Sequence, residues 1–410
     1  MKADIAIIGG GASGLAAAVS AARSGAKNIY ILEKQPRVGK KLLATGNGRC
    51  NLYNENACAD AYFGSRSFAD YALRSFSPFQ AEKFFLSLGI MTRKTEDGLY
   101  YPMSNQASAV LDCLRETAKE AGVNEITGFS VSSVEGGIGK FRILSEDGKI
   151  VTAKRVILAC GSMASPKNGG TNAFQMILKP LGHKIRPCFP VLTQLKTLPE
   201  CVTGLKGLKY QGEISLYEKN TYIAGESGEI LFGENSISGI AVMQLSLHAA
   251  ERLAKGRKLF LRMRLLPMSF QETIVFLKKR IKNNPARPLE EFLTGVLQKR
   301  IGQNALKRIG IQSLSARCDS LSDEMIEKLS KELTEWTVPV TGIGGFDAAQ
   351  VMLGGADTHD FVPETMESRL VPGLYAAGEL MDITGPCGGY NLAWAWASGI
   401  LAGRSAAKDL

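Results

Sequence analysis

The chain of 410 residues has no two cysteines in the spacing Cys-x-x-Cys, and its eight cysteines are scattered between positions 50 and 387. This arrangement excludes the usual signatures of a dithiol–disulfide reductase and of a zinc ribbon, and it fits thiols that stay reduced in the cytoplasm. Histidine is also scarce: only positions 183, 248 and 359 carry it, without the spacing of a catalytic triad or a metal-ligand set. The sequence therefore predicts no metal site.

Long hydrophobic runs are missing as well. The most apolar late stretch, residues 390–403, is shorter than the roughly 20 residues that a transmembrane helix needs. At the N-terminus, Asp4 interrupts the apolar residues and a glycine turn follows at once, unlike the pattern of a signal peptide. These absences predict a cytoplasmic protein with no membrane partner.

Acidic residues are scarce in one part of the chain. Residues 251–308 hold fifteen Lys and Arg but only four Asp and Glu, a net charge of +11, whereas the whole chain carries +10. A basic region of this kind indicates a polyanionic partner such as RNA. The alternative is a set of helix faces whose charges are simply solvated.

A dinucleotide-binding fingerprint is present at the start of the chain. The apolar residues 6–8 run into a turn that contains Gly9, Gly11 and Gly14 and opens a helix of small residues. In such a turn the three glycines permit the tight bend, the approach of a pyrophosphate and close helix–strand packing, respectively. Glu33 ends the next apolar run, nineteen residues after Gly14, where an acid that binds the ribose is expected. The alternative is a glycine turn in a sheet that binds no nucleotide.

Three further segments favour FAD over NAD as the tightly held cofactor. A strand ends in Gly378-Glu379, with Asp382 close behind, which would place a carboxylate near the ribityl or pyrophosphate region. Gly388-Gly389-Tyr390-Asn391 opens the last helix, whose first amides could stabilise negative charge on a reduced flavin. Ala159-Cys160-Gly161 follows an apolar strand that would back the cofactor. No second complete fingerprint is present, so NAD(P)H is expected only as a transient reductant.

The candidate FAD-binding residues are therefore spread over several segments. They are Gly9, Gly11, Ala12, Ser13, Gly14, Glu33, Lys34, Lys40, Asn47, Gly48, Arg49, Val131, Ala159, Gly161, Gly378, Glu379, Asp382, Gly388, Gly389, Tyr390 and Asn391. Lys40 and Arg49 are also candidates for stabilising phosphate or the charge of a reduced flavin.

The two ends of the chain share one pattern of alternating strands and helices, and the middle has another. We predict an α/β fold whose Rossmann-like FAD-binding domain is formed by both termini, residues 1–185 and 338–410. A β-barrel-like domain, 186–268, and a helical domain, 269–337, would be inserted between them. Apolar spacing within the helical domain predicts helices at 270–281, 289–301 and 323–333.

Longer motifs carry a resemblance to a known family. Gly-Lys-Lys-Leu-Leu at 39–43, Gly-Asn-Gly-Arg-Cys-Asn at 46–51 and Gly-Gly-Tyr-Asn-Leu at 388–392 resemble signatures of the BaiN-like (YhiN-type) flavoproteins. The resemblance implies an FAD domain assembled from both ends, the two inserts, and an NAD(P)/FAD-dependent oxidoreductase. It also implies, for some members, reduction of activated carbon–carbon double bonds. The loop at 232–240 departs from the family's usual Thr-His-containing sequence.

Reduction of such a bond needs an acid for the carbon that receives no hydride. Cys50 and Cys387 are the candidate donors, because each lies in a glycine-rich segment expected near the cofactor. The alternative for each is a small buried side chain.

Three functions remain open from the sequence. The first is an FAD-dependent reductase of a small conjugated substrate, with NAD(P)H as electron donor. The second is reduction of uridine to dihydrouridine in ribosomal RNA, bound through the basic segment 251–308. The third is an FAD-binding regulatory protein without turnover. The sequence predicts no oligomeric state.

Overall fold

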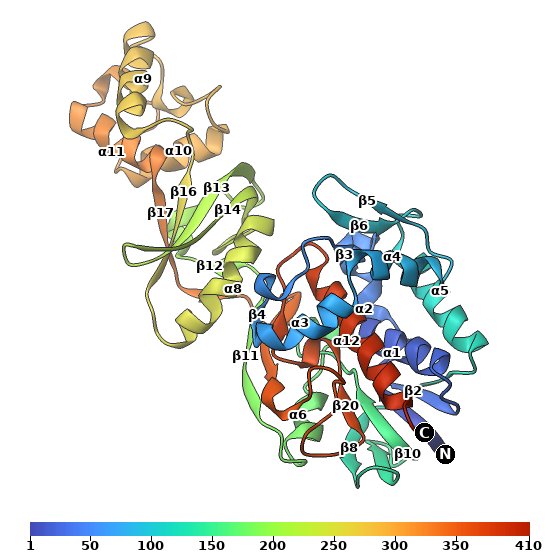
Figure 1. Cartoon of the computed structure of the whole chain (residues 1–410). Helices are drawn as coiled ribbons and strands as arrows, with labels where there is room; N and C mark the ends of the chain where they lie inside the picture. The colour runs from blue at the N-terminus through green and yellow to red at the C-terminus, as the bar shows by residue number, and fades with distance from the viewer. The chain divides into compact units, whose positions relative to one another are not determined.

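The computed structural model describes residues 1–410, and the chain divides into two compact units (Figure 1). The first unit comprises Met1–Pro190 and Phe346–Leu410, so it contains both ends of the chain. The second unit comprises Val191–Gly345. None of the helices combines the length and the hydrophobicity that a membrane crossing requires.

The main sheet of the first unit has the strand order β7-β2-β1-β10-β9-β8, and β20 also pairs with β10. These strands are β1 (Lys2–Ile8), β2 (Ile29–Glu33), β7 (Asn124–Thr127), β8 (Val131–Glu135), β9 (Phe141–Ser145), β10 (Ile150–Leu158) and β20 (Leu374–Ala376). β1 runs parallel to both β2 and β10, and β20 runs parallel to β10. A strand from the C-terminal segment thus completes a sheet begun at the N-terminus, which confirms the predicted Rossmann-like α/β class.

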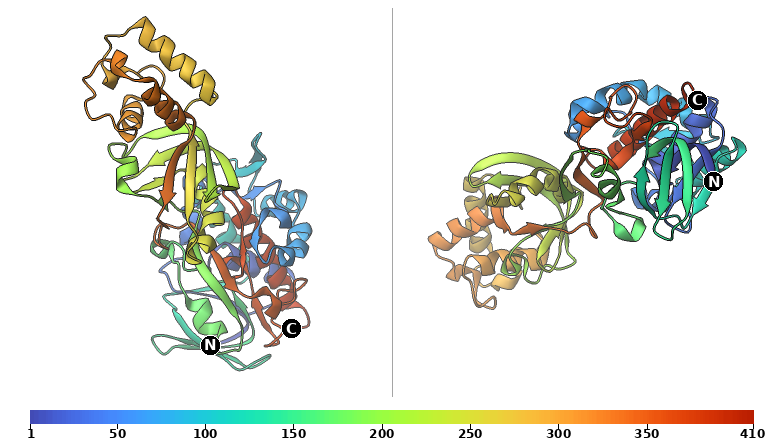
Figure 2. Two further views of the ribbon diagram at one scale, coloured as in Figure 1. Left: turned by 90° about the vertical axis from the view of Figure 1, so that its left-hand side faces the viewer. Right: turned by 90° about the horizontal axis from the view of Figure 1, so that it is seen from below.

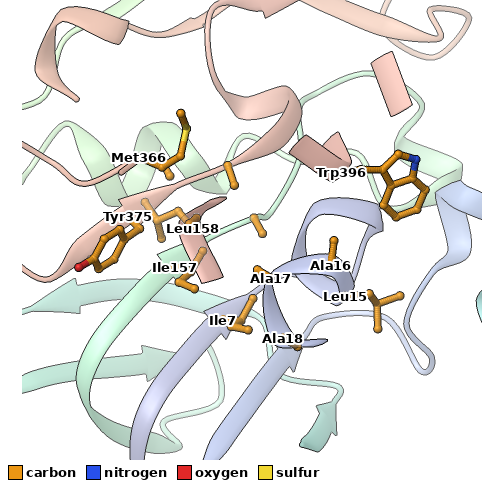
Figure 3. Packing of buried hydrophobic residues seen from close by; sticks show 14 of the residues in the cluster. Ile7, Leu15, Ala16, Ala17, Ala18, Ile157, Leu158, Met366, Tyr375 and Trp396 are labelled. Atoms are coloured by element: carbon orange, nitrogen blue, oxygen red, sulfur yellow. The ribbon is translucent and has the colours of Figure 1, made fainter. Parts of the chain in front are cut away.

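Two helices from opposite ends of the chain pack together beside this sheet. α1 (Ala12–Arg23) and α12 (Tyr390–Ala407) touch through their backbones, because a Cβ atom added to Gly399 or Gly403 would lie 2.3 Å or 2.2 Å from a carbonyl oxygen of α1. Small residues therefore allow the close approach. Figure 3 shows Ala16 and Ala17 of α1 packed near Ile7 of β1 and Ile157 of β10.

A second, smaller sheet of the first unit carries aromatic residues on both faces. It has the order β3-β6-β5, with β3 (Tyr53–Asn54), β5 (Thr92–Lys94) and β6 (Leu99–Pro102). Tyr53 packs edge-on against Phe76 and Tyr100, whereas Arg93 and Tyr101 are direct cross-strand partners. The other α-helices and strands of the unit that exceed three residues are α2 (Lys40–Leu43), α3 (Arg66–Ser75), α4 (Pro78–Leu86), α5 (Ala107–Glu120), α6 (Ala173–Leu178), β11 (Ile185–Val191) and β19 (Val351–Ala356).

The second unit is built on a seven-stranded sheet of order β17-β16-β13-β14-β15-β12-β18. Its strands are β12 (Leu195–Lys196), β13 (Lys209–Glu218), β14 (Thr221–Phe232), β15 (Ser236–Ser238), β16 (Leu259–Arg264), β17 (Trp336–Val340) and β18 (Gly342–Ile343). Its helices are α7 (Pro199–Val202), α8 (Ile240–Ala254), α9 (Phe270–Asn283), α10 (Lys299–Arg308) and α11 (Asp323–Thr334). Within this unit, α9, α10 and α11 lie at one end of the sheet (Figure 1 and the left view of Figure 2).

The predicted domain boundaries differ from the two units. β17 pairs with β16, and β18 pairs with β12, so residues 338–345 lie in the second unit and not in the FAD-binding domain. The predicted β-barrel-like and helical domains form one unit, because buried residues of the sheet and of the helices share one hydrophobic cluster.

The predicted helix at 289–301 is wrong. The chain there forms a 3₁₀ turn, Leu289–Glu291, and α10 begins only at Lys299. Leu289 and Phe292 are buried from an irregular segment, which Arg280 holds by donating to the carbonyl oxygen of Phe292 at 2.8 Å. Apolar residues at helical spacing thus fill the core without a helix.

Candidate nucleotide-binding site

The fingerprint glycines open a space at the start of α1. Gly9 has φ +105°, and a Cβ added to it would lie 2.4 Å from the carbonyl oxygen of Ala159. A Cβ on Gly14 would lie 1.9 Å from the carbonyl oxygen of Gly9, so helix and strand are in contact. A Cβ on Gly11, by contrast, would meet no atom within 4 Å. Two glycines are needed for packing, and the third faces open space at a helix N-terminus, as a pyrophosphate requires.

Glu33 lies beside this glycine turn at the end of β2. Its two carboxylate oxygens accept from the amides of Gly10 and Gln35, each at 2.8 Å. The carboxylate is therefore fixed in place, and each oxygen retains a lone pair for a ribose hydroxyl. Gly128 and Phe129 donate their amides to the carbonyl oxygens of Gln35 and Glu33, which brings the segment before Val131 to the same place.

The C-terminal segment reaches the start of α1 through Gly378. This residue has φ +79°, and an added Cβ would lie 2.5 Å from the hydroxyl oxygen of Ser13. Its amide donates to the hydroxyl of Ser398 at 2.9 Å, and its carbonyl oxygen accepts from the indole of Trp394 at 3.0 Å. The predicted Gly378-Glu379 turn therefore lies against the fingerprint helix.

Sequence reasoning missed two side chains that hold Glu379. Lys41 forms an ion pair with one carboxylate oxygen at 2.7 Å, and Ser162 donates to the other at 2.5 Å. Lys41 lies within the family motif at 39–43, next to the predicted Lys40, and Ser162 follows the predicted Gly161. Both residues could therefore have been found as neighbours of positions that were already candidates. Lys40 itself is exposed and donates to Gln35 at 3.3 Å.

The loop at 45–51 adjoins the turn that opens α12. With its amide oriented for hydrogen bonding, Asn51 accepts from the amide of Gly389 at 3.2 Å and donates to the carbonyl oxygen of Tyr53. Asn54 donates to the carbonyl oxygen of Gly388 at 2.8 Å. The two segments that were predicted to border the flavin are therefore joined.

Several predicted ligand residues hold loops with their side chains. Asn391 pairs with both the amide and the carbonyl oxygen of Gly385, each at 2.8 Å. Asp382 accepts from the hydroxyl of Ser65 at 3.0 Å. Lys34 donates to the carbonyl oxygen of Gly170 at 3.2 Å. The structure thus assigns positioning contacts to these three side chains. Ala12 and Tyr390 lie at the N-terminal ends of α1 and α12, and Asn47, Gly48 and Arg49 are exposed.

The structure does not support Cys50 as a proton donor. Its side chain is fully buried, and burial raises the pKa of the thiol from 9.0 to about 12, against a smaller opposite effect of the hydrogen bond with Thr45. An inaccessible, weakly acidic thiol is expected for the alternative role of Cys50, a small buried side chain. Cys387 is half-buried in the turn before α12 and stays a prediction.

We expect thiol labelling to separate Cys50 from the exposed Cys58. At pH 8 a maleimide should modify Cys58 within minutes and leave Cys50 unmodified until the protein is unfolded, because attack requires an accessible thiolate. Peptide mass spectrometry before and after denaturation measures this. Rapid native labelling of Cys50 would show that the loop opens.

The same thiol contributes to the pH dependence of stability. An unfolded Cys50 ionises above about pH 9 and the folded one only near pH 12, so its contribution is complete below pH 9 and is lost between these values. Denaturant unfolding at pH 8 and pH 10.5 should therefore show a smaller decrease for Cys50→Ser than for the unchanged protein.

The comparisons with known proteins cover nearly the whole chain. Residues 3–405 match the family described as HI0933-like protein Rossmann domain. The chain belongs to this family. A 3-dehydro-bile acid delta(4,6)-reductase from Clostridium scindens is 38% identical over 98% of this chain and 99% of its own length. A ribosomal RNA dihydrouridine synthase from Escherichia coli is 30% identical over 96% of each chain.

A solved structure supports the same fold for this family member. Quinol fumarate reductase FrdA from E. coli matches with a TM-score of 0.50 and 16% identity, over 100% of this chain and 70% of that one. Family membership confirms the BaiN-like resemblance and identifies the chain as a flavoprotein oxidoreductase with a Rossmann-like FAD-binding domain.

Proposed function

We propose that this flavoprotein reduces an activated carbon–carbon double bond in a small conjugated substrate, with NAD(P)H as electron donor. The observation that carries the proposal is the full-length similarity to the Clostridium scindens reductase, whose name denotes reduction of a steroid double-bond system. The bound FAD would supply the hydride chemistry.

The chain's own residues would hold FAD from three directions. Amides at the start of α1 would bind the pyrophosphate, where the open space over Gly11 leaves room for it. Glu33 would accept from the adenosine ribose, since both of its oxygens are already fixed by backbone amides. Glu379, held by Lys41 and Ser162, would accept from hydroxyls of the ribityl chain.

The N-terminus of α12 would lie beside the flavin ring. Positive partial charge at a helix N-terminus favours negative charge nearby, so this end would stabilise the reduced flavin. Asn51 and Asn54 fix the Gly388-Gly389 turn, and the side chain of Asn391 fixes the preceding loop at Gly385. These contacts would keep the first amides of α12 in one place.

Anaerobic reduction of the yellow protein tests this proposal. We expect NADH or NADPH to bleach the flavin absorbance and a conjugated enone to restore it, whereas the corresponding saturated ketone should not. Product analysis should show loss of the double bond. A flavin that neither nucleotide bleaches would favour the regulatory alternative, and reoxidation by unmodified ribosomal RNA alone would favour an RNA substrate.

The RNA alternative has weaker support. A relative named ribosomal RNA dihydrouridine synthase favours it, together with the basic segment 251–308. However, five of the fifteen basic side chains form ion pairs with acidic residues outside the segment. Lys278 pairs with Asp323 at 2.7 Å and Arg262 with Glu335 at 2.7 Å. The excess of positive charge around the segment is therefore smaller than its own net charge of +11 implies.

The residues to neutralise in an RNA-binding test follow from these contacts. In the run at 278–280, Lys278 is ion-paired and Arg280 supports the backbone at Phe292, so only Lys279 is a clean target. Lys282 is exposed on the same helix. An RNA-binding enzyme should lose affinity and salt dependence in the double variant Lys279→Gln/Lys282→Gln. The matched control is Lys206→Gln/Lys328→Gln, whose two ammonium groups are each paired with a glutamate.

A further inference from the structure

Two arginines of the first unit converge on one tyrosine ring. The guanidinium carbon of Arg49 lies 5.1 Å from the ring centroid of Tyr101, and that of Arg93 lies 5.9 Å from it. Tyr101 is only 7% exposed, whereas both arginines are exposed. A fixed aromatic ring therefore holds two cationic groups at the surface.

The backbone explains why these side chains meet. Arg93 on β5 is the direct antiparallel partner of Tyr101 on β6, so their side chains project from the same face of the small sheet. The loop that carries Arg49 also contacts this ring, because a Cβ on Gly46 would lie 3.6 Å from a ring carbon of Tyr101. Three chain segments thus define the arrangement.

Each guanidinium is oriented by one further contact. Arg49 donates through Nε to the carbonyl oxygen of Gly46 at 3.1 Å, and Arg93 donates through Nη2 to the side-chain oxygen of Asn105 at 3.2 Å. A guanidinium has five N–H donors, so each arginine retains several for another acceptor. Because both arginines are exposed, an acceptor from solution can reach these donors.

No carboxylate compensates the two positive charges. Neither arginine forms an ion pair with an Asp or Glu within 4.0 Å, in contrast to Arg115 and Arg142, which do. Two like charges held near one ring repel each other, and a compact oxyanion would relieve that repulsion. Paired guanidinium groups are the preferred recognition elements for carboxylate and phosphate.

This arginine pair adjoins the candidate flavin site. Two residues after Arg49, Asn51 contacts Gly389 in the turn that opens α12. We propose that Arg49 and Arg93, supported by Tyr101, bind an oxyanion carried by the substrate away from its reacting bond, a carboxylate in a small conjugated acid. This inference rests on the proposed function, and it assigns Arg49 to the substrate instead of to FAD.

Kinetics with a matched pair of substrates test the proposal. The substrates are a conjugated enone that carries a carboxylate and the methyl ester of the same compound. For Arg49→Gln and Arg93→Gln we expect KM for the acid to rise by about tenfold or more, with kcat changed less than about twofold. KM for the ester should stay the same. Lysine at either position should restore part of the loss, because it keeps the charge without the planar fork.

The control is Arg142→Gln, an exposed arginine on β9 that is paired with Glu135. It should leave KM for both substrates unchanged. Equal KM increases for acid and ester, or none for either, would overturn the proposal. So would a selective increase in KM for NADPH over NADH, because the oxyanion would then be the 2′-phosphate of the donor.

A binding measurement separates this inference from the proposed function. The saturated analogue of the acid cannot be reduced, and its affinity for the FAD-loaded protein can be measured by titration calorimetry. Binding that weakens about tenfold in both glutamine variants supports the arginine site even if no enone is turned over. Enone reduction with equal affinity in all variants would retain the proposed function and overturn the site.

Discussion

Gly11→Asp is expected to abolish FAD retention without destabilising the apoprotein. Gly11 has φ −80° and ψ −168°, which any residue adopts, and an added Cβ meets no protein atom within 4 Å. No side chain caps α1 at present, so an aspartate there should stabilise the free helix by a few tenths of a kcal/mol. The same carboxylate would occupy the space for the pyrophosphate and repel its charge. We expect affinity for FAD to fall by at least about 100-fold, which corresponds to about 2.8 kcal/mol.

Two further substitutions at this position separate volume from charge. Gly11→Asn has nearly the same size without the charge and should retain more FAD than Gly11→Asp, and Gly11→Ala more still. Flavin fluorescence after gel filtration measures retention, and thermal unfolding of the apoprotein measures stability. If Gly11→Asp kept its flavin, the start of α1 would not be the pyrophosphate site.

Gly399→Ala and Gly403→Ala are expected to destabilise the first unit, although the same change usually strengthens a helix. In an exposed helix interior, alanine in place of glycine stabilises by about 1 kcal/mol. Here the new methyl group would lie 2.3 Å from the carbonyl oxygen of Ser13, or 2.2 Å from that of Ala17. Because backbone atoms cannot move aside cheaply, α12 would have to separate from α1. We expect each variant to lose about 2 kcal/mol of stability.

Urea unfolding followed by circular dichroism measures this loss. Arg404→Ala is the control, because Arg404 follows Gly403 directly on the same helix but is exposed. The control should change stability by less than about 0.5 kcal/mol. Equal or greater stability in either glycine variant would mean that α1 and α12 are not in backbone contact. Weaker FAD binding should accompany the loss, since Ser13 lies at the start of α1.

The sequence predicted best those parts of the site whose geometry depends on residues close together in the chain. The turn from Gly9 to Gly14 carries its own geometric requirements, so its conformation and packing follow from residue type and spacing. Glu33 could be placed because a single helix and a single strand connect the turn to it. The Rossmann-like class followed for the same reason, since both termini show local alternation of strand and helix.

The rest depends on contacts that spacing does not encode. Lys41 and Ser162 meet Glu379 from positions 338 and 217 residues away, and only the folded sheet brings them together. The end of the inserted unit was misplaced because β17 and β18 are short, and their pairing partners lie far earlier in the chain. Burial of Cys50 likewise depends on the packed neighbours and not on its glycine-rich surroundings.

The pairing of β12 with β18 has a consequence for the evolution of the second unit. Leu195 lies opposite Ile343 and Lys196 opposite Gly342, so the first and last strands of the insert are hydrogen-bonded neighbours. The chain therefore enters and leaves the second unit at neighbouring positions. A segment with adjacent ends can be exchanged as a whole without a change in the connections of the first unit. Replacement or loss of residues 191–345 as a block would therefore leave the strand order of the flavoprotein scaffold unchanged.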